Sequence, residues 1–323
     1  MKHPITRRTA LAAWASVALP GLSLAQTDRP IKFILPNATG SGVDAITRAA
    51  APALGKALGA NVVVENQAGA GGLVGLQALS KNPPDGNTLS VVSNNVVIFP
   101  SVMKSLPFDM PGDFTPIAIV GSTPMILVVN PQKVSATNSR EFIAALKAKP
   151  DGYNFGSGGN GTILHLAAEM FLDEAKVSAR HIPYKGVGPM VTDLLGGQID
   201  FGVVALPSVQ QHIKSGALRA IGACADKRTA AAPDIPTFVE QGLTGYSMEA
   251  WFAVIGPKGM APAQVKKVHD AVVAAFNDPG VKDTMAKQGN TINITSTEQA
   301  QKGFRTELAK YAALVKKAGI EPQ

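Results

Sequence analysis

Short β-branched segments alternate along most of the chain with segments whose apolar residues recur at helical spacing. The first predicted strand, residues 31–35, leads through a turn-rich segment into a helix that carries Ile46 and Leu54 on one face. Pro52 lies inside this helical pattern and is expected to kink or split the helix. Alternation of this kind predicts α/β architecture. Further strands are predicted at 61–65, 88–93, 126–130, 153–155, 181–184, 199–205 and 218–224, and further helices from 73 on and at 141–149, 162–172 and 190–195.

A second series of strands and helices begins near residue 130 and is comparable in size to the first. After a strand that begins at Trp251, the pattern predicts two or three helices, the last over residues 297–318. No repeat of 20–50 residues is present in the sequence. We therefore expect two α/β units followed by a long helical tail.

The N-terminus has the features of a secretory signal peptide. Three basic residues and no acidic residue precede an apolar run at 10–19, which is too short to span a bilayer. Small residues at the −3 and −1 positions favour cleavage after Ala25. We expect residues 1–25 to be removed on export to the periplasm, and the Arg7–Arg8 pair leaves both the general and the twin-arginine route open.

Composition narrows the class of protein further. The net charge of the 323-residue chain, +7, falls to +4 once residues 1–25 leave with three basic residues, so no nucleic-acid partner is expected. A chain with 46% hydrophobic and 16% charged residues is neither disordered nor a coiled coil. The one cysteine, Cys224, excludes an internal disulfide framework and is interpreted as a small buried side chain.

Two turn-rich loops each join a predicted strand to a predicted helix. The free N–H groups of a helix's first turn, together with the helix dipole, bind anions without any basic side chain. Neither loop contains Lys or Arg, so a carboxylate held by N–H groups, hydroxyls and amides fits this chemistry. The alternative is that both loops are tight turns with N-caps. The candidate residues are Asn37, Ala38, Thr39, Gly40, Ser41, Gly42 and Asp44 in the first loop, and Ser157, Gly158, Asn160, Gly161 and Thr162 in the second.

Two of these features have a second interpretation. Asp44 forms either a surface pair with Arg48 or a contact that orders the first loop. The second loop matches the dinucleotide fingerprint G-x-G-x-x-G through Gly156, Gly158 and Gly161. That fingerprint needs an acidic residue about 20 positions later, and the segment 179–185 contains none, which argues against a nucleotide cofactor.

Catalytic and metal-binding patterns are weak. The five histidines are scattered, so no metal site and no cofactor is predicted. His165 is either a polar group near a ligand cleft or a satisfied interior histidine, and Lys185 either faces a ligand or is a solvated turn lysine. A secreted enzyme acting on a small organic acid remains the alternative function, with Ser157 and His165 as the only local pair of nucleophile and base.

Seven ordered motifs resemble those of the Bug family, the substrate-binding proteins of tripartite tricarboxylate transporters. The resemblance extends over essentially the whole chain after the signal peptide. The motifs are VENQAGAGG at 64–72, PDGNTL at 84–89, DFTPI at 113–117, GSG at 156–158 with HL at 165–166, HIPYKG at 181–186, DLLGGQ at 193–198 and PDIPT at 233–237.

The resemblance implies a type II periplasmic binding protein in which two lobes, each a mixed or parallel sheet flanked by helices, enclose a cleft. Residues 26–127 and 248–323 would form lobe 1 and residues 128–247 lobe 2, with crossings near 125–130 and 245–250. The implied protein is a monomeric receptor and not an enzyme. It binds a di-, tri- or aromatic carboxylate and delivers it to the membrane subunits of the transporter; a receptor for a sensor kinase fits equally well.

The family's ligand contacts also include two strand ends, which correspond here to Ser93 with Asn94 and to Val204 with Ala205. The first loop departs from the family pattern at two positions. Asn37 stands where the family typically has an aromatic residue, and Ser41 follows Gly40 where the family has a paired glycine. Asn37 removes an apolar wall and adds an amide, which leaves the identity of the carboxylate open.

Overall fold

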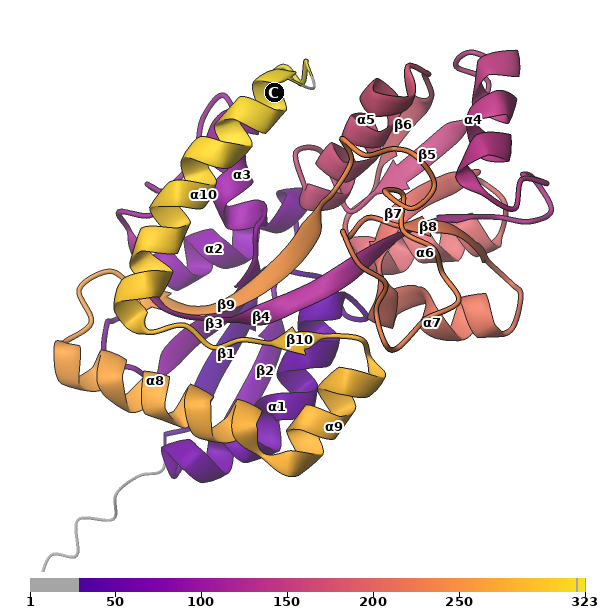
Figure 1. Cartoon of the computed structure of the whole chain (residues 1–323). Coiled ribbons are helices and arrows are strands. Elements are labelled where there is room, and N and C mark those ends of the chain that lie inside the picture. The colour runs from indigo at the N-terminus through magenta and orange to yellow at the C-terminus, as the bar shows by residue number, and fades with distance from the viewer. Residues whose placement is uncertain (1–28, 318, 323) are drawn as a thin grey trace, which may run out of the picture.

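One long strand, β4 (Phe114–Val129), connects two groups of strands in the computed structural model, which describes residues 29–317 and 319–322 (Figure 1). The first part of β4 pairs antiparallel with β9 (Glu249–Pro257). Its last five residues pair antiparallel with β7 (Phe201–Ala205) and β8 (Arg219–Ala223) on the opposite edges. The predicted signal peptide lies outside the described residues.

The first lobe contains a mixed sheet of strand order β2-β1-β3-β9-β4, with β10 added along β4. Strands β1, β2 and β3 are parallel, whereas β9 runs antiparallel to both of its neighbours. Helices α1, α8 and α9 cover one face of this sheet, and α2, α3 and α10 cover the other (Figure 1). The elements are β1 (Ile31–Leu35), α1 (Gly42–Leu58), β2 (Val62–Asn66), the short 3₁₀ helix η1 (Ala70–Gly72), α2 (Leu73–Ser80), β3 (Thr88–Ser93), α3 (Asn95–Val102), α8 (Pro262–Asn277), α9 (Pro279–Lys287), β10 (Thr291–Ile292) and α10 (Thr297–Lys317).

The second lobe is built on the end of β4 and on β7, β5 and β6, of which β5 is parallel to both its neighbours. Buried residues of α5 pack in one apolar cluster on one side of this sheet, and residues of α6 and α7 pack in another. The remaining elements are α4 (Ser139–Ala148), β5 (Asn154–Ser157), α5 (Ile163–Ala175), β6 (Arg180–Pro183), α6 (Val187–Leu195) and α7 (Leu206–Lys214).

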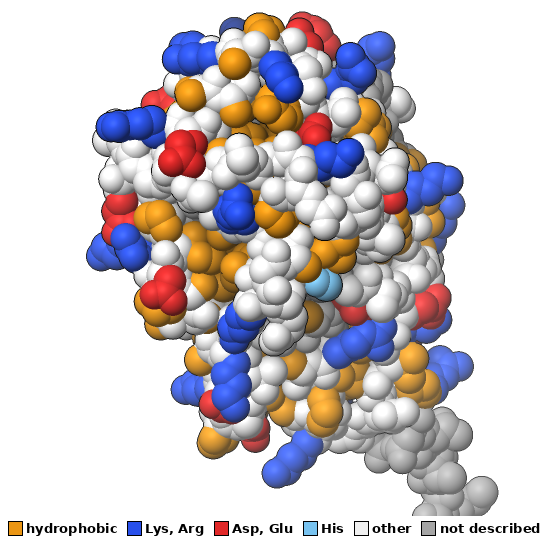
Figure 2. Space-filling view, turned by 90° about the vertical axis from the view of Figure 1, so that its right-hand side faces the viewer, with side chains coloured by type: hydrophobic (Ala, Val, Ile, Leu, Met, Phe, Trp, Pro, Cys, Tyr) orange, Lys and Arg blue, Asp and Glu red, His pale blue; other side chains and the backbone are white. Residues whose placement is uncertain are grey.

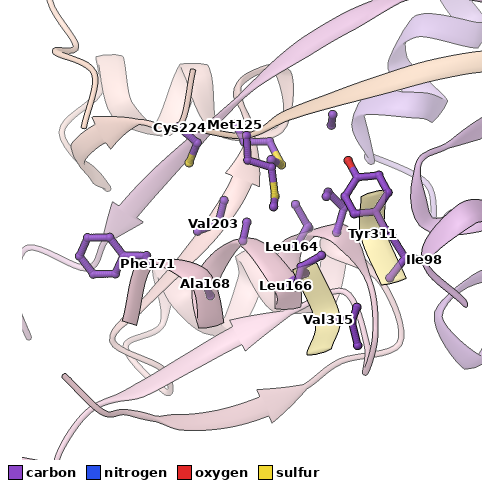
Figure 3. Close-up of a cluster of buried hydrophobic side chains, with 14 of the residues drawn as sticks. Ile98, Met125, Leu164, Leu166, Ala168, Phe171, Val203, Cys224, Tyr311 and Val315 are labelled. Atoms are coloured by element: carbon purple, nitrogen blue, oxygen red, sulfur yellow. The ribbon is translucent and has the colours of Figure 1, made fainter. Parts of the chain in front are cut away.

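The largest apolar cluster extends from one lobe into the other. Figure 3 shows Leu164 and Leu166 of α5 in the same cluster as Tyr311 and Val315 of α10. All four side chains are nearly inaccessible to solvent. Apolar packing therefore supports the contact between the lobes as well as each lobe by itself.

The charged side chains show no concentration of one sign on the face drawn in Figure 2, where Lys and Arg are scattered singly among acidic residues. Cys224 is fully buried, as predicted. None of the helices within residues 29–317 and 319–322 is both long and apolar enough to cross a membrane.

The predicted α/β architecture and most predicted elements are confirmed, several within one residue at each end. The structure differs from the sequence-based expectations at four places. Pro52 was expected to kink or split its helix, and it does not split it, because α1 runs without interruption and carries Pro52 on its exposed side. The strand predicted at 126–130 is only the last part of the 16-residue β4, and the helices α3 and α7 were not predicted.

Candidate ligand-binding cavity

A cavity lies between the two lobes and is lined by residues from both. The space inside the cavity that no protein atom fills, including its opening to solvent, is about 720 Å³. The lobes thus stand close together around a space suited to a small molecule. Its first-lobe walls come from the loop after β1, the segment 68–72 and the start of β9, and its second-lobe walls from the loops before α5 and α6 and the end of β7.

Eight of the seventeen predicted site residues line this cavity, and nine do not. Both loops and two of the four strand-end residues contribute to the lining. The lining residues are Asn37, Ala38, Ser41, Gly42, Ser93, Gly158, Thr162 and Ala205. Those outside the lining are Thr39, Gly40, Asp44, Asn94, Ser157, Asn160, Gly161, His165 and Val204.

The N-terminus of α1 points free donors at the cavity. Ser41 is the N-cap and its Oγ accepts a hydrogen bond from Asp44 N at 3.2 Å. The N–H groups of Gly42 and Val43 have no acceptor within the described part of the chain, and both residues line the cavity. A helix N-terminus with two free N–H groups and the positive end of the helix dipole favours an anion.

The N-terminus of α5 faces the same cavity from the second lobe. Thr162 is the N-cap and accepts from His165 N, while Ile163 N donates to Asn95 Oδ1 of the first lobe at 2.8 Å. Leu164 N is left without an acceptor among residues 29–317 and 319–322, and Leu164 lines the cavity. The two loops predicted to be anion sites therefore meet at one space, and each keeps at least one free donor after capping.

Asp44 makes the contacts that order the first loop, which was one of the two interpretations of this residue in the sequence. Its carboxylate accepts from Gly40 N at 3.1 Å and from Asn66 Nδ2 at 2.9 Å. Asn66 Nδ2 also donates to Asn37 O at 3.0 Å, so both ends of the loop are held. The predicted pair with Arg48 is present too, with 2.8 Å between Arg48 Nε and Asp44 Oδ1. Asp44 thus holds the loop in place from outside the cavity lining.

Ser157 is hydrogen-bonded to His181, and not to His165, the histidine that the enzyme alternative requires. Its Oγ lies 2.7 Å from His181 Nε2 and accepts from Gly159 N at 3.1 Å. His165 stacks on the His181 ring at 3.9 Å between centroids, accepts from Gly161 N at Nδ1, and lies 3.5 Å from Glu169 through Nε2. Burial, reinforced by the neighbouring His165 ring, lowers the pKa of His181 to about 3. The Ser157–His165 pair required by the enzyme alternative is therefore not formed.

Several lining residues were not among the seventeen predicted site residues. Lys185 lines the cavity and is the one charged residue among the lining residues that the structure describes, so its ligand-facing interpretation is the one that the geometry favours. Asn95 rather than Asn94 faces the cavity, because Asn94 Nδ2 donates to Glu249 O and to Tyr311 Oη instead. Residues 68–72 belong to the motif VENQAGAGG at 64–72, so the sequence did contain a signal for this wall of the cavity.

Two walls come from positions far away in the sequence. Trp251 on β9 lines the cavity, and its Nε1 donates to Glu307 Oε2 of α10 at 3.1 Å. Thr123 lies beside Ala250 where β4 leaves the first lobe. No local pattern marks either residue, because only the pairing of β4 with β9 brings them to the cavity. In the described part of the chain no three metal-ligating side chains lie together.

Known proteins resemble this chain both in sequence and in structure. A family model described as the tripartite tricarboxylate transporter family receptor matches residues 46–320. Protein BugT of Bordetella pertussis is 34% identical over 311 residues, which cover 96% of this chain and 95% of BugT. The structure of the periplasmic binding protein BugD superposes with a TM-score of 0.87 at 30% identity, covering 91% of this chain and 99% of BugD.

A third similar structure is that of an R. palustris protein with adipate, which has a TM-score of 0.87 and 25% identity and covers 91% of this chain and 98% of the other. The predicted fold class, a two-lobed periplasmic binding protein of mixed sheets flanked by helices, is confirmed by these superpositions. The family consists of binding proteins and not of enzymes, so the enzyme alternative is set aside. By sequence and by structure, this chain belongs to the family of tripartite tricarboxylate transporter receptors, the Bug family.

Proposed function

We propose that this protein binds a small carboxylate in the interlobe cavity and presents it to the membrane subunits of a tripartite tricarboxylate transporter. The observation that carries the proposal is that two helix N-termini, one from each lobe, border one cavity, where the N–H groups of Gly42, Val43 and Leu164 have no acceptor among residues 29–317 and 319–322. The adipate bound to a similar protein supports a carboxylate as the ligand class.

The cavity offers a carboxylate more than backbone donors. The hydroxyl of Ser93 and the ammonium of Lys185 belong to residues of its wall. Lys185 is exposed at the turn before α6, so its charge adds attraction without the cost of burying an ammonium group. Trp251, Val187 and Ile163 supply apolar walls, which suit the carbon skeleton of an organic acid.

The ligand contacts that we propose are the eight predicted residues of the lining together with Lys185. Asp44, Ser157 and His165 act through the loops that they hold. We further propose that residues 26–127 with 248–323 and residues 128–247 form the two lobes, and that the mature chain works in the periplasm as a monomer after removal of residues 1–25.

Isothermal titration calorimetry against a panel of di-, tri- and aromatic carboxylates tests the proposal. We expect at least one acid to bind with a dissociation constant in the micromolar range or below, and the amine analogue of the same skeleton to show no binding. If none of the acids binds to protein freed of co-purified ligand by unfolding and refolding, the carboxylate proposal is wrong. Mass spectrometry of the periplasmic protein, with an N-terminus at Gln26, tests the processing.

A further inference from the structure

Two residues of the motif HIPYKG at 181–186 lie directly behind the second-lobe wall of the cavity. Lys185 and Gly186 of this motif line the cavity, whereas His181 and Tyr184 do not. His181 belongs to β6, the last strand of the sheet, and Tyr184 follows the end of that strand. Both side chains are half-buried, and both form hydrogen bonds to other parts of the second lobe.

His181 holds the loop before α5. Its Nε2 lies 2.7 Å from the Oγ of Ser157, the residue with which this loop begins. The imidazole ring itself is fixed by two ring contacts, with Phe155 at 4.8 Å and with His165 at 3.9 Å between centroids. The bond from a fixed ring to Ser157 restrains residues 157–162, which form part of the cavity wall.

The main chain connects this loop to the residue after β6. Tyr184 N donates to Ser157 O at 3.1 Å. A Cβ atom placed on Gly159 would lie 3.3 Å from Tyr184 O, so the loop and the turn at 184–187 are in contact. They form one continuous part of the second-lobe wall.

Tyr184 fixes this turn against α6. Its hydroxyl donates to Asp193 Oδ2 at 2.8 Å, beyond the middle of the helix. Burial, together with the hydrogen bond to this carboxylate, raises the pKa of Tyr184 to about 12, so the hydroxyl keeps its proton at neutral pH. The bond thus holds the turn that carries Lys185 to the cavity.

The second-lobe wall is packed closely against the first lobe. A Cβ atom placed on Gly186 would lie 2.6 Å from Ala38 Cβ, and one placed on Gly161 would overlap Val102 Cγ2. In such close packing, a small shift of the loop or of the turn changes the shape of the cavity and the direction of the N–H groups in it.

We propose that His181 and Tyr184 are positioning residues, which set the ligand affinity by holding the loop 157–162 and the turn 184–187 in place. The inference rests on the proposed carboxylate-binding function and adds to it the two side chains that hold the second-lobe wall. Each acts through one hydrogen bond, to Ser157 and to Asp193 respectively.

Hydrogen–deuterium exchange of the free protein, followed by mass spectrometry, tests whether the two bonds hold these segments. His181→Leu should speed exchange in residues 157–162 about fivefold or more, and Tyr184→Phe should do the same in residues 184–187. Helix α10 should exchange as in the wild-type protein. His181→Gln, whose amide extends as far as Nε2, should restore slow exchange, and the shorter His181→Asn should not. Asp193→Asn keeps an acceptor for the tyrosine hydroxyl and should also exchange slowly.

Calorimetry with succinate, adipate, citrate and benzoate measures the effect on binding. We expect the variants that break a bond to weaken the affinity for each acid that binds about fivefold or more, and the variants that keep it by less than about twofold. Two matched controls should bind like the wild-type protein. His269→Leu removes a first-lobe histidine whose Nε2 lies 3.0 Å from Thr295 O, and Tyr153→Phe changes a second-lobe tyrosine outside the cavity lining.

Unchanged exchange in both segments would overturn the inference. Exchange that rises equally along the whole chain would also overturn it, because it would show a loss of global stability only, and so would local loosening with unchanged affinity. If none of the acids binds, the carboxylate function is wrong, while exchange in the free protein still decides whether the two bonds hold the wall. Ser157→Ala and Asp193→Leu break the same bonds from the other side, so a variant that fails to fold does not remove the test.

Discussion

Replacing Gly42 by alanine tests whether closure of the lobes determines ligand affinity. Gly42 is the first residue of α1, and a Cβ atom placed on it would lie 3.1 Å from Ala205 Cβ at the end of β7 in the second lobe. Gly42 does not adopt a positive φ, and alanine is the better helix former, so the first lobe itself should tolerate the change. The added methyl group therefore acts mainly on the contact between the lobes.

The expected size of the effect follows from the crowding. A Cβ–Cβ distance of 3.1 Å requires a shift of a few tenths of an ångström, and neither atom is the end of a flexible side chain. Overpacking of a close contact typically costs about 1–3 kcal/mol. If the open form is unaffected, this cost falls on the closed complex and weakens ligand binding about 5- to 150-fold.

Calorimetry with the tightest-binding acid measures this change, and small-angle X-ray scattering measures the radius of gyration with and without ligand. Gly303→Ala is the matched control. A Cβ atom on Gly303 would also lie 3.1 Å from a neighbouring atom, Ile119 Cδ1, but Gly303 and Ile119 both belong to the first lobe, so the contact between the lobes is not affected. We expect Gly303→Ala to bind like the wild-type protein. If Gly42→Ala binds with unchanged affinity and compacts to the same radius, the lobe contact does not limit closure and the reasoning is refuted.

Three further predictions concern buried groups. Burial raises the pKa of the Cys224 thiol to about 12. A thiol reagent at pH 8 should therefore label the native protein at a small fraction of the rate measured for the protein unfolded in urea. Comparable labelling rates would contradict this prediction. Tyr246→Phe removes the hydroxyl that donates to Ala167 O and should lower the free energy of unfolding in urea by about 1 kcal/mol. An unchanged midpoint of the urea-unfolding transition would show that this hydrogen bond contributes nothing. The pKa of His181 is about 3 in the folded protein and near 6.5 in the unfolded chain, so the unfolded state binds more protons below pH 6.5. The free energy of unfolding therefore falls as the pH drops from 6.5 toward 3. His181→Gln should therefore lose less stability between pH 7 and pH 5 than the wild-type protein, and equal losses in urea titrations would refute this.

The parts of the fold that sequence predicted well are those whose signals are local. Strand β1, the loop after it and α1 follow from a β-branched run, turn residues and apolar spacing within 28 residues, 31–58. Strand β4 was largely missed because Pro116, Gly121 and Pro124 interrupt it as turn residues do. Its pairing with β9 shifts register near the first two, so irregular pairing accommodates these residues.

Helix α3 shows a different limit of local reasoning. Its sequence, NVVIFPSV, is almost wholly apolar and contains Pro100, so it has neither the helical period nor the composition of a free-standing helix. It is helical because six of its eight residues are buried, several of them against the first-lobe core and α10. Tertiary packing, which no window of sequence contains, decided this element.

The same distinction applies to the cavity. The two anion loops could be predicted, since each is a contiguous segment between a strand and a helix. Thr123 and Trp251 could not, because they are 128 positions apart and reach the cavity only through the pairing of β4 with β9. The sequence therefore indicates the two loops of the cavity wall but not the residues that β4 and β9 contribute to it.

Both polar and apolar contacts join the two lobes beside the cavity. Two hydrogen bonds near the cavity join the lobes directly, one from Ile163 N to Asn95 Oδ1 and one from Ser208 Oγ to Gly40 O. Bonds of this kind contribute about 1 kcal/mol each, and the apolar cluster shared by α5 and α10 adds to the contact between the lobes. A ligand shifts the equilibrium only by binding the closed form more tightly than the open form. On the proposed function, a carboxylate meets this condition when it receives N–H groups from α1 and α5 together, because these two helices belong to different lobes.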